Sequence, residues 1–180
     1  MRRLIAAALV LACVPALPAR AGSISLGAFG GMSYPVQQDD VGNGTLYGVR
    51  APVSLVPFLT VEPYWASSKI GNKVVSTPLG DVTNKGFDET AYGASVLLAT
   101  GGPVSFYPFG SVGQTAIEIG GKSKSYTTYG AGFGIGFSAV PKVALHLRGE
   151  FQAVVDGTTH TTRKFGTGTL GLSYALFSLP

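Results

Sequence analysis

The stretch VALHLRGEFQAVV, residues 143–155, alternates apolar and polar side chains almost residue by residue. The apolar parity comprises Val143, Leu145, Leu147, Phe151 and Val155. The polar parity comprises His146, Arg148, Glu150 and Gln152. Successive side chains of a β-strand point to opposite faces of the sheet, so this pattern predicts a strand with one apolar and one charged face. Such a strand needs an apolar environment on one side and a polar environment on the other.

The same period of two recurs along the chain between turn-forming residues, and it predicts eight strands. They span about residues 23–34, 45–55, 58–66, 87–98, 104–117, 126–138, 142–155 and 164–177. Each has roughly the 9–11 residues, or slightly more, that a tilted strand needs to cross a bilayer. The strand at 126–138 sets apolar side chains against glycines, whereas the strand at 104–117 admits both parities.

The predicted connections alternate strictly between long polar segments and short uncharged segments. The long ones are residues 35–44, 67–86, 118–125 and 156–163, and the short ones are 56–57, 99–103 and 139–141. In an up-and-down antiparallel arrangement, this alternation places every long connection at one end. Outer-membrane barrels have this asymmetry, with long extracellular loops and short periplasmic turns.

Composition and the N-terminus indicate an exported membrane protein. Residues 1–21 have a basic start, an apolar run and an Ala19-Arg20-Ala21 ending, which predicts a cleaved signal peptide followed by one domain, 22–180. Three of the 13 Lys and Arg residues lie in this signal, so the predicted mature chain has ten cations and nine acids. Its net charge is therefore close to zero, and the charge does not favour nucleic acid as a partner. Only 12% of residues are charged, against about 25% in soluble domains.

The predicted mature chain nevertheless has no apolar run of about 18 residues, the length that a transmembrane helix requires. The sole cysteine, Cys13, lies in the signal, so no disulfide can form after cleavage. A closed barrel is the remaining way to place so much apolar surface in a membrane. The sequence therefore predicts an all-β protein, an eight-stranded antiparallel up-and-down transmembrane β-barrel.

Several segments resemble the small outer-membrane β-barrel superfamily, the OmpA, OmpX and opacity-type barrels. They are the signal ending ARA, the strand SISLGAFGGMSY, the pair YPFGSVGQTAIEIGG and YGAGFGIGF, and the last strand TGTLGLSYALF. The resemblance spans residues 22–180 and implies a Gram-negative outer-membrane location with extracellular long loops. In the family the last strand ends on an aromatic residue that the assembly machinery reads. Here Phe177 is followed by three more residues.

An eight-stranded barrel has a bore that side chains can fill, so the inward polar set is the first candidate site. It comprises Arg50, Glu62, Glu89, His146, Arg148, Glu150 and Gln152, with Gln114 and Glu118 if the strand at 104–117 takes that parity. Because unpaired buried charges are costly, we expect a lumen network of ion pairs.

Aromatic residues gather near the strand ends, as expected for side chains at the headgroup level. The set on the long-loop side is Tyr34, Tyr47, Trp65, Tyr92 and Tyr126; on the short-turn side it is Phe58, Phe106, Phe109, Phe137 and Phe177, with Tyr174 also proposed for the girdle.

The leading hypothesis is a monomeric, non-enzymatic barrel with a structural or surface-interaction role, its bore closed by the charge network, and with neither cofactor nor metal. Its expected partners are outer-membrane lipids, lipopolysaccharide and the assembly machinery. The alternatives are a narrow small-solute channel, a lipid A-modifying enzyme that would use His146 or His160, and a secreted lipocalin-like carrier. A carrier would have the opposite polarity, with apolar side chains inside.

Overall fold

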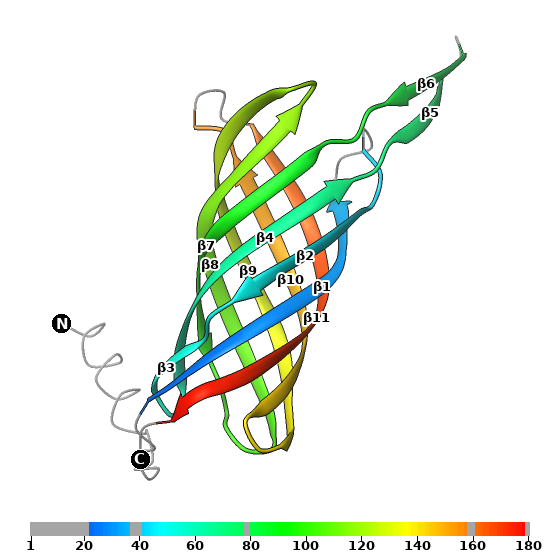
Figure 1. Ribbon diagram of the computed structural model, residues 1–180. Helices are drawn as coiled ribbons and strands as arrows, with labels where there is room; N and C mark the ends of the chain where they lie inside the picture. The colour runs from blue at the N-terminus through cyan, green and yellow to red at the C-terminus, as the bar shows by residue number, and fades with distance from the viewer. Residues whose placement is uncertain (1–21, 37–40, 78–79, 158–160, 179–180) are drawn as a thin grey trace, which may run out of the picture.

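The computed structural model describes residues 22–36, 41–77, 80–157 and 161–178, which form a closed antiparallel β-barrel (Figure 1). The last strand, β11, pairs with β1 over most of their length, and this pairing closes the sheet. Nine strands take part in the sheet, but β2 and β3 both lie between β1 and β4 and act as one interrupted strand. The barrel wall therefore has eight strands, as the sequence predicts.

The strand bounds follow the predicted segments closely. The wall strands are β1 (Ser23–Val36), β2 (Gly44–Arg50), β3 (Val53–Val56), β4 (Leu59–Ile70), β7 (Asp88–Leu98), β8 (Val104–Ile119), β9 (Lys122–Val140), β10 (Val143–Val155) and β11 (Thr162–Ser178). The interruption between β2 and β3 falls at Pro52, which has no backbone N–H to donate to a neighbouring strand. The predicted signal peptide lies outside the described residues.

Two of the predicted long connections have more structure than the sequence indicates. Residues 118–125 are not a loop: Gly120 and Gly121 both have positive φ, and they form a tight turn between two extended strands. A two-residue turn with φ > 0 at both positions matches the twist of a hairpin, which explains why a tight turn stands where the sequence predicted a long loop. Within 67–86, β5 (Lys73–Thr77) and β6 (Gly80–Asn84) form a separate two-stranded ribbon that projects from the barrel (Figure 1).

Apolar side chains face outward along the whole wall. The exposed set includes Leu145, Leu147 and Phe151 of β10 and Leu170, Leu172 and Tyr174 of β11. Among the described residues, buried polar side chains are as numerous as buried apolar ones, and they include Ser33, Arg50, Glu62, Ser95, Thr115 and Arg148. Apolar outside and polar inside is the polarity of a transmembrane barrel and the reverse of a lipocalin-like carrier. Among the described residues, no helix is long and apolar enough to span a membrane.

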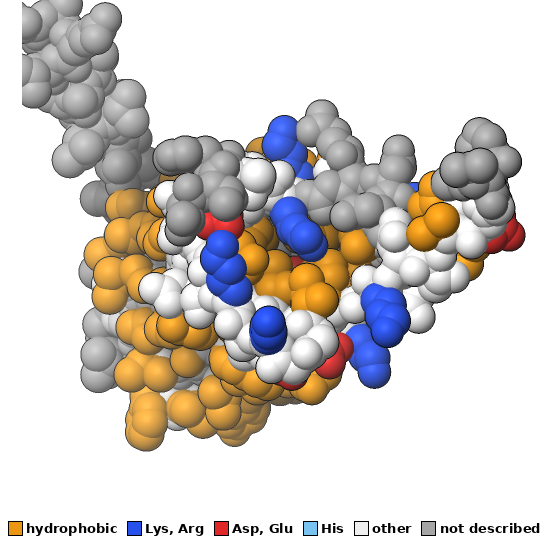
Figure 2. All heavy atoms as spheres, turned by 90° about the horizontal axis from the view of Figure 1, so that it is seen from above, with side chains coloured by type: hydrophobic (Ala, Val, Ile, Leu, Met, Phe, Trp, Pro, Cys, Tyr) orange, Lys and Arg blue, Asp and Glu red, His pale blue; other side chains and the backbone are white. Residues whose placement is uncertain are grey.

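Two apolar clusters lie inside the barrel, one toward each end. Near the short turns, Leu97 of β7 packs with Tyr107 and Phe109 of β8. Near the long connections, a larger cluster comprises Val41, Ile70, Phe87, Ile117, Val154 and Phe165. Figure 2 looks down on this second end and shows hydrophobic side chains within the opening. The larger cluster therefore separates the polar part of the interior from the end with the long connections.

Candidate functional site in the barrel lumen

The candidate site begins on β10, whose inward side chains form a ladder along the lumen. His146, Arg148, Glu150 and Gln152 lie opposite four glycines of β9, Gly136, Gly134, Gly132 and Gly130 respectively. The alternation of residues 143–155 thus puts long polar side chains beside a strand whose inward positions are glycines. The bore of an eight-stranded barrel is only wide enough for side chains to fill it, so this pairing makes the room that the long ones need.

The glycines of β9 are required by close contacts. A Cβ at Gly134 would collide with the Tyr107 ring, and a Cβ at Gly130 would collide with the Glu150 carboxylate and the Ser111 hydroxyl. At Gly132, a Cβ would lie 2.7 Å from Cζ of Phe109. The inner surface of β9 is therefore covered by side chains of its two neighbours, β8 and β10.

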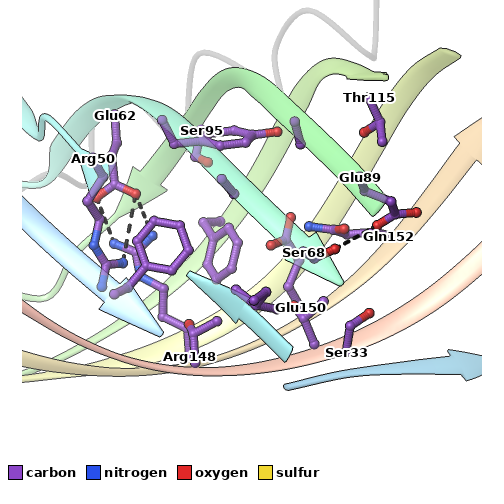
Figure 3. Close-up of a pocket in the computed structure, with 18 of the residues that line it drawn as sticks. Ser33, Arg50, Glu62, Ser68, Glu89, Ser95, Thr115, Arg148, Glu150 and Gln152 are labelled. Carbon is purple, nitrogen blue, oxygen red and sulfur yellow. Dashed lines mark hydrogen bonds and ion pairs between the residues drawn. The ribbon is translucent and has the colours of Figure 1, made fainter. Parts of the chain in front are cut away.

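At the centre of the ladder, Arg148 makes a two-pronged ion pair with Glu62 of β4. Its Nη1 and Nη2 donate to Oε1 and Oε2 of Glu62 at 2.5 and 2.8 Å. Arg50 of β2 approaches the same carboxylate, with Nη1 4.0 Å from Oε1. Glu62 is only 1% exposed and Arg50 3%. Figure 3 shows these side chains converging from three different strands, and bidentate geometry of this kind is among the strongest charged pairings in proteins.

Aromatic rings surround the two guanidinium groups. Cζ of Arg148 lies 5.1 Å from the ring centroid of Tyr107 and 5.3 Å from that of Phe109. Cζ of Arg50 lies 5.0 Å from the Phe29 ring. These separations are within the range of cation–π attraction, which is stronger away from water. The charge cluster is thus held between rings as well as by its own ion pairs.

His146 takes part in a chain of hydrogen bonds that reaches toward the short turns. Nε of Arg148 donates to the Tyr107 hydroxyl at 3.0 Å, and that hydroxyl lies 3.1 Å from Nδ1 of His146. Nε2 of His146 lies 2.8 Å from Oγ of Ser173, which donates onward to the Ala144 carbonyl. Arg148 can only donate, so the chain runs consistently with Tyr107 donating to Nδ1 and His146 donating to Ser173.

The Ser173–His146 contact is a serine–histidine pair that sequence spacing did not reveal. General-base catalysis needs a histidine nitrogen that accepts the serine proton, usually with a carboxylate on the other nitrogen. In the hydrogen bonds that run from Arg148 to Ser173, Nε2 of His146 donates and Nδ1 faces the Tyr107 phenol, so the Ser173–His146 pair is arranged as a structural link. The other histidine considered from the sequence, His160, lies outside the described residues.

The part of the ladder nearer the long connections contains the remaining predicted polar residues. Ser111 donates to Glu150 at 2.5 Å, and Ser68 donates to Glu89 at 2.9 Å. The second Glu89 oxygen is buried without a hydrogen-bond partner among the described residues. Gln152 lines the same space. Glu89 therefore has one oxygen free to meet water in the cavity that it lines.

That cavity has a volume of about 70 Å³ and is lined by Arg50, Glu62, Glu89, Arg148, Glu150 and Gln152 together with smaller polar and apolar side chains (Figure 3). A water molecule needs roughly 10–15 Å³ of such volume, so a few waters fit. Small-molecule sites are usually several times larger, at roughly 300–1,000 Å³. The cavity is of a size for water rather than for an organic ligand.

Strand β8 resolves the ambiguous parity. Its inward residues are Tyr107, Phe109, Ser111, Thr115 and Ile117. Gln114 consequently faces outward, where it accepts a hydrogen bond from Tyr92 at 2.8 Å, and Glu118 is exposed near the Gly120–Gly121 turn. Neither joins the lumen network.

The aromatic residues divide between the outside and the inside of the barrel. Nine of the eleven residues proposed for the girdle are exposed: Tyr34, Tyr47, Phe58, Trp65, Tyr92, Phe106, Phe137, Tyr174 and Phe177. Phe109 does not lie there: it is 6% exposed and packs inside against Tyr107. Tyr126 packs against the apolar cluster near the long connections. Both residues follow the inward parity of their strands, which the sequence left open for Phe109 and indicated for Tyr126 through the glycines of the same parity.

Cations gather at the end of the barrel that carries the long connections, where Figure 2 shows Lys and Arg side chains around the opening. Lys124 of β9 donates to Asp156 at 2.5 Å, and this hydrogen bond raises the pKa of Lys124 above its ordinary value. Arg163 of β11 lies over the Phe87 ring at 5.2 Å. In the part of the chain that the structure describes, no group of three or more His, Cys, Asp or Glu side chains could hold a metal ion.

Solved structures with the same architecture come from several bacteria. Neisserial surface protein A matches with a TM-score of 0.62 and 16% identity, over 88% of this chain and 99% of that protein. The chain has the fold of the small outer-membrane β-barrels. The outer-membrane protein OprG from Pseudomonas aeruginosa gives a TM-score of 0.61 at 11% identity, over 87% of this chain and 97% of that one.

The outer-membrane protein Ail from Yersinia pestis, whose structure was determined in a phospholipid bilayer nanodisc, shares this barrel fold. Its TM-score is 0.52 at 18% identity, over 86% of this chain and 99% of that chain. No protein-family model matches the sequence, and no curated protein matches it. At such identities, the likenesses establish the eight-stranded transmembrane barrel fold and leave its role to the side chains.

Proposed function

We propose that this chain is an integral outer-membrane protein of a Gram-negative bacterium, with a structural or surface-interaction role and a bore closed to solutes. Two features support the membrane location: the barrel fold, and an outer surface on which the described strands expose leucine, valine and aromatic side chains. Lipid is the solvent that such a surface requires.

The observation that carries the closed bore is the bidentate Arg148–Glu62 pair with Arg50 beside it. These side chains come from three strands and meet within the lumen, and rings of Phe29, Tyr107 and Phe109 pack around the guanidinium groups. The apolar cluster near the long connections forms a second layer. An ion entering the lumen would have to displace a buried ion pair and then cross an apolar layer.

The orientation that we propose places the long connections outside the cell. The Lys124–Asp156 pair and Arg163 lie at that end, with the projecting β5–β6 ribbon. Lys69 of β4 and Lys164 of β11 have the outward parity of their strands near that end, and such cations suit a leaflet rich in phosphorylated lipid, which makes outer-membrane lipids and lipopolysaccharide the expected partners. We also propose a monomer, inserted by the outer-membrane assembly machinery through its last strand, β11, with Phe177 exposed near the end.

The second candidate is a narrow channel for small solutes. The polar cavity beside the ion pair favours it, because this cavity already places space for water next to the charged side chains of the lumen. An enzymatic role is not proposed, since the Ser173–His146 pair is arranged as a structural link within the lumen.

Conductance in planar lipid bilayers separates the two candidates. The purified barrel should give no stable conductance steps, whereas the double variant Glu62→Ala/Phe165→Ala should conduct, because it removes both the carboxylate that holds the two arginines and a buried ring of the apolar layer. Glu118→Ala is the matched control, since that carboxylate is exposed near a turn. Stable ohmic steps from the wild-type barrel would show that the bore is open, and a silent Glu62→Ala/Phe165→Ala barrel would show that the charge cluster and the apolar layer do not close it.

A further inference from the structure

The outer wall of the barrel has one region where large side chains are missing. Gly149 of β10 lies opposite Gly168 of β11, and Gly166 follows two residues along the same face. On β9, the outward residue Ala131 is also small; it pairs with Phe151 of β10. Together, Ala131, Gly149, Gly166 and Gly168 form the floor of a shallow outer groove.

Packing does not explain the glycines at the centre of this floor. A Cβ at Gly149 or at Gly168 would meet nothing within 4 Å, whereas one at Gly134 in the lumen would collide with Tyr107. Neither residue has the positive φ that would favour glycine. Glycine inside a strand costs roughly 0.5–1 kcal/mol relative to alanine. Two such positions side by side, facing open space, point to something that approaches the backbone closely.

Aromatic side chains form the walls of the groove. Phe133 of β9 stands on one side and is 74% exposed, and Phe151 of β10 lies beside it. Tyr34 of β1 stands on the other side. The exposed lining is almost entirely apolar, so the occupant must present hydrocarbon rather than polar groups.

A cation lies beyond one end of the groove. Lys164 shares the outward parity of Gly166 and Gly168 on β11 and pairs with Ala153 and Val36. At about 3.4 Å per residue, it is roughly 7 Å beyond Gly166 toward the long connections. An apolar floor that ends at a cation complements an anionic amphiphile. A second copy fits less well, because a two-fold contact through the groove would bring the two Lys164 side chains toward each other.

We propose that this groove binds one acyl chain of a phosphorylated glycolipid of the lipid A type, with a phosphate at Lys164. The chain would lie on the bare backbone of Gly149 and Gly168 between Phe133 and Tyr34. The choice of lipid A rests on the proposed orientation, which places Lys164 at the outer leaflet. The groove itself does not depend on that orientation.

Native mass spectrometry of the barrel released from detergent, with hexa-acylated bisphosphorylated lipid A as the probe, tests this. The wild type should retain one lipid A. The double variant Gly149→Val/Gly168→Val should retain it at least about tenfold more weakly, because the side chains fill the floor. Lys164→Gln should weaken retention about fivefold, in line with about 1 kcal/mol for a cation near an anionic surface.

Matched controls are Ala94→Val, an outward position on β7, and Lys69→Gln, an exposed cation on β4. Both should bind as the wild type does. Phe133→Ala offers a second variant that leaves the glycines untouched, and it should also weaken retention. Heat-dependent migration on a gel confirms that each variant is folded.

Wild-type retention of lipid A by the valine double variant would overturn the site. Equal retention of uncharged diacylglycerol would overturn the role of Lys164, and a dimer peak that the valines abolish would identify a second copy as the occupant instead. Retention of phosphatidylglycerol in place of lipid A would overturn the choice of lipid and point to the opposite orientation. None of these outcomes depends on conductance, so failure here is distinguishable from failure of the closed-bore proposal.

Discussion

Removal of the Glu62 carboxylate is the most informative perturbation of the lumen. Glu62 is 1% exposed, accepts two hydrogen bonds from Arg148 and lies 4.0 Å from Arg50, so Glu62→Ala leaves two buried guanidinium groups without their shared partner. Breaking a buried ion pair in this way costs about 3–5 kcal/mol. The adjoining cavity can admit a few waters to solvate the arginines, which places the expected loss near the lower end of that range.

The free energy of unfolding lost on removing each of the three side chains, Glu62, Arg148 and Arg50, should follow a fixed order. Arg148→Ala leaves Glu62 with Arg50, which is already close enough to take over part of the pairing, so its cost should be smaller. Arg50→Ala leaves the bidentate pair intact and should cost least. The free energy of unfolding is measured by urea titration in lipid vesicles, with the folded fraction read from gel migration. A Glu62→Ala barrel that loses less than about 1 kcal/mol, or an Arg50→Ala barrel that loses as much as Glu62→Ala, would refute this reasoning.

Three further predictions follow from the same contacts. Gly134→Ala should destabilise the barrel by about 1–3 kcal/mol through its collision with Tyr107, whereas Gly149→Ala should leave stability unchanged or raise it by up to about 1 kcal/mol. Urea titration compares the two variants, and equal losses of stability would contradict this prediction. Tyr107→Phe should cost about 1–3 kcal/mol, because Nε of Arg148 loses its buried acceptor, and an unchanged unfolding midpoint would show that water replaces the hydroxyl. Deletion of residues 73–84 should leave heat-dependent gel migration intact, since β5 and β6 pair only with each other among the described strands. Loss of the fast-migrating band would mean that the ribbon supports the wall.

Much of the barrel could be predicted because its two environments impose a simple period. Lipid outside and a narrow polar bore inside make alternate residues differ in kind, as in β10, and the turn-forming residues between these segments mark where one strand ends and the next begins. The parity of β8 could not be predicted, because SFYPFGSVG carries aromatic residues on both faces. Phe109 consequently lies in the lumen rather than in the girdle.

Contacts between distant strands were also out of reach of sequence patterns. Arg148 and Glu62 are 86 residues apart, and His146 and Ser173 are 27 apart, so their meeting depends on strand register and barrel shear. The apolar cluster near the long connections was missed because Phe87 and Phe165 lie at strand ends, where they resemble interfacial aromatics. The outer groove could have been suspected from Gly149, Gly166 and Gly168, which interrupt the outward apolar parity of their strands.

The central claim is that this chain is a barrel folded in the outer membrane, and one gel tests it directly. The outer-membrane fraction of cells that express the full-length chain is extracted in detergent and loaded with and without heating. We predict that the protein is found in this fraction and that the unheated sample migrates faster than the heated one, because the closed sheet resists dodecyl sulfate until it is heated. A protein recovered in the soluble periplasmic fraction, or one whose migration does not change on heating, would contradict the account.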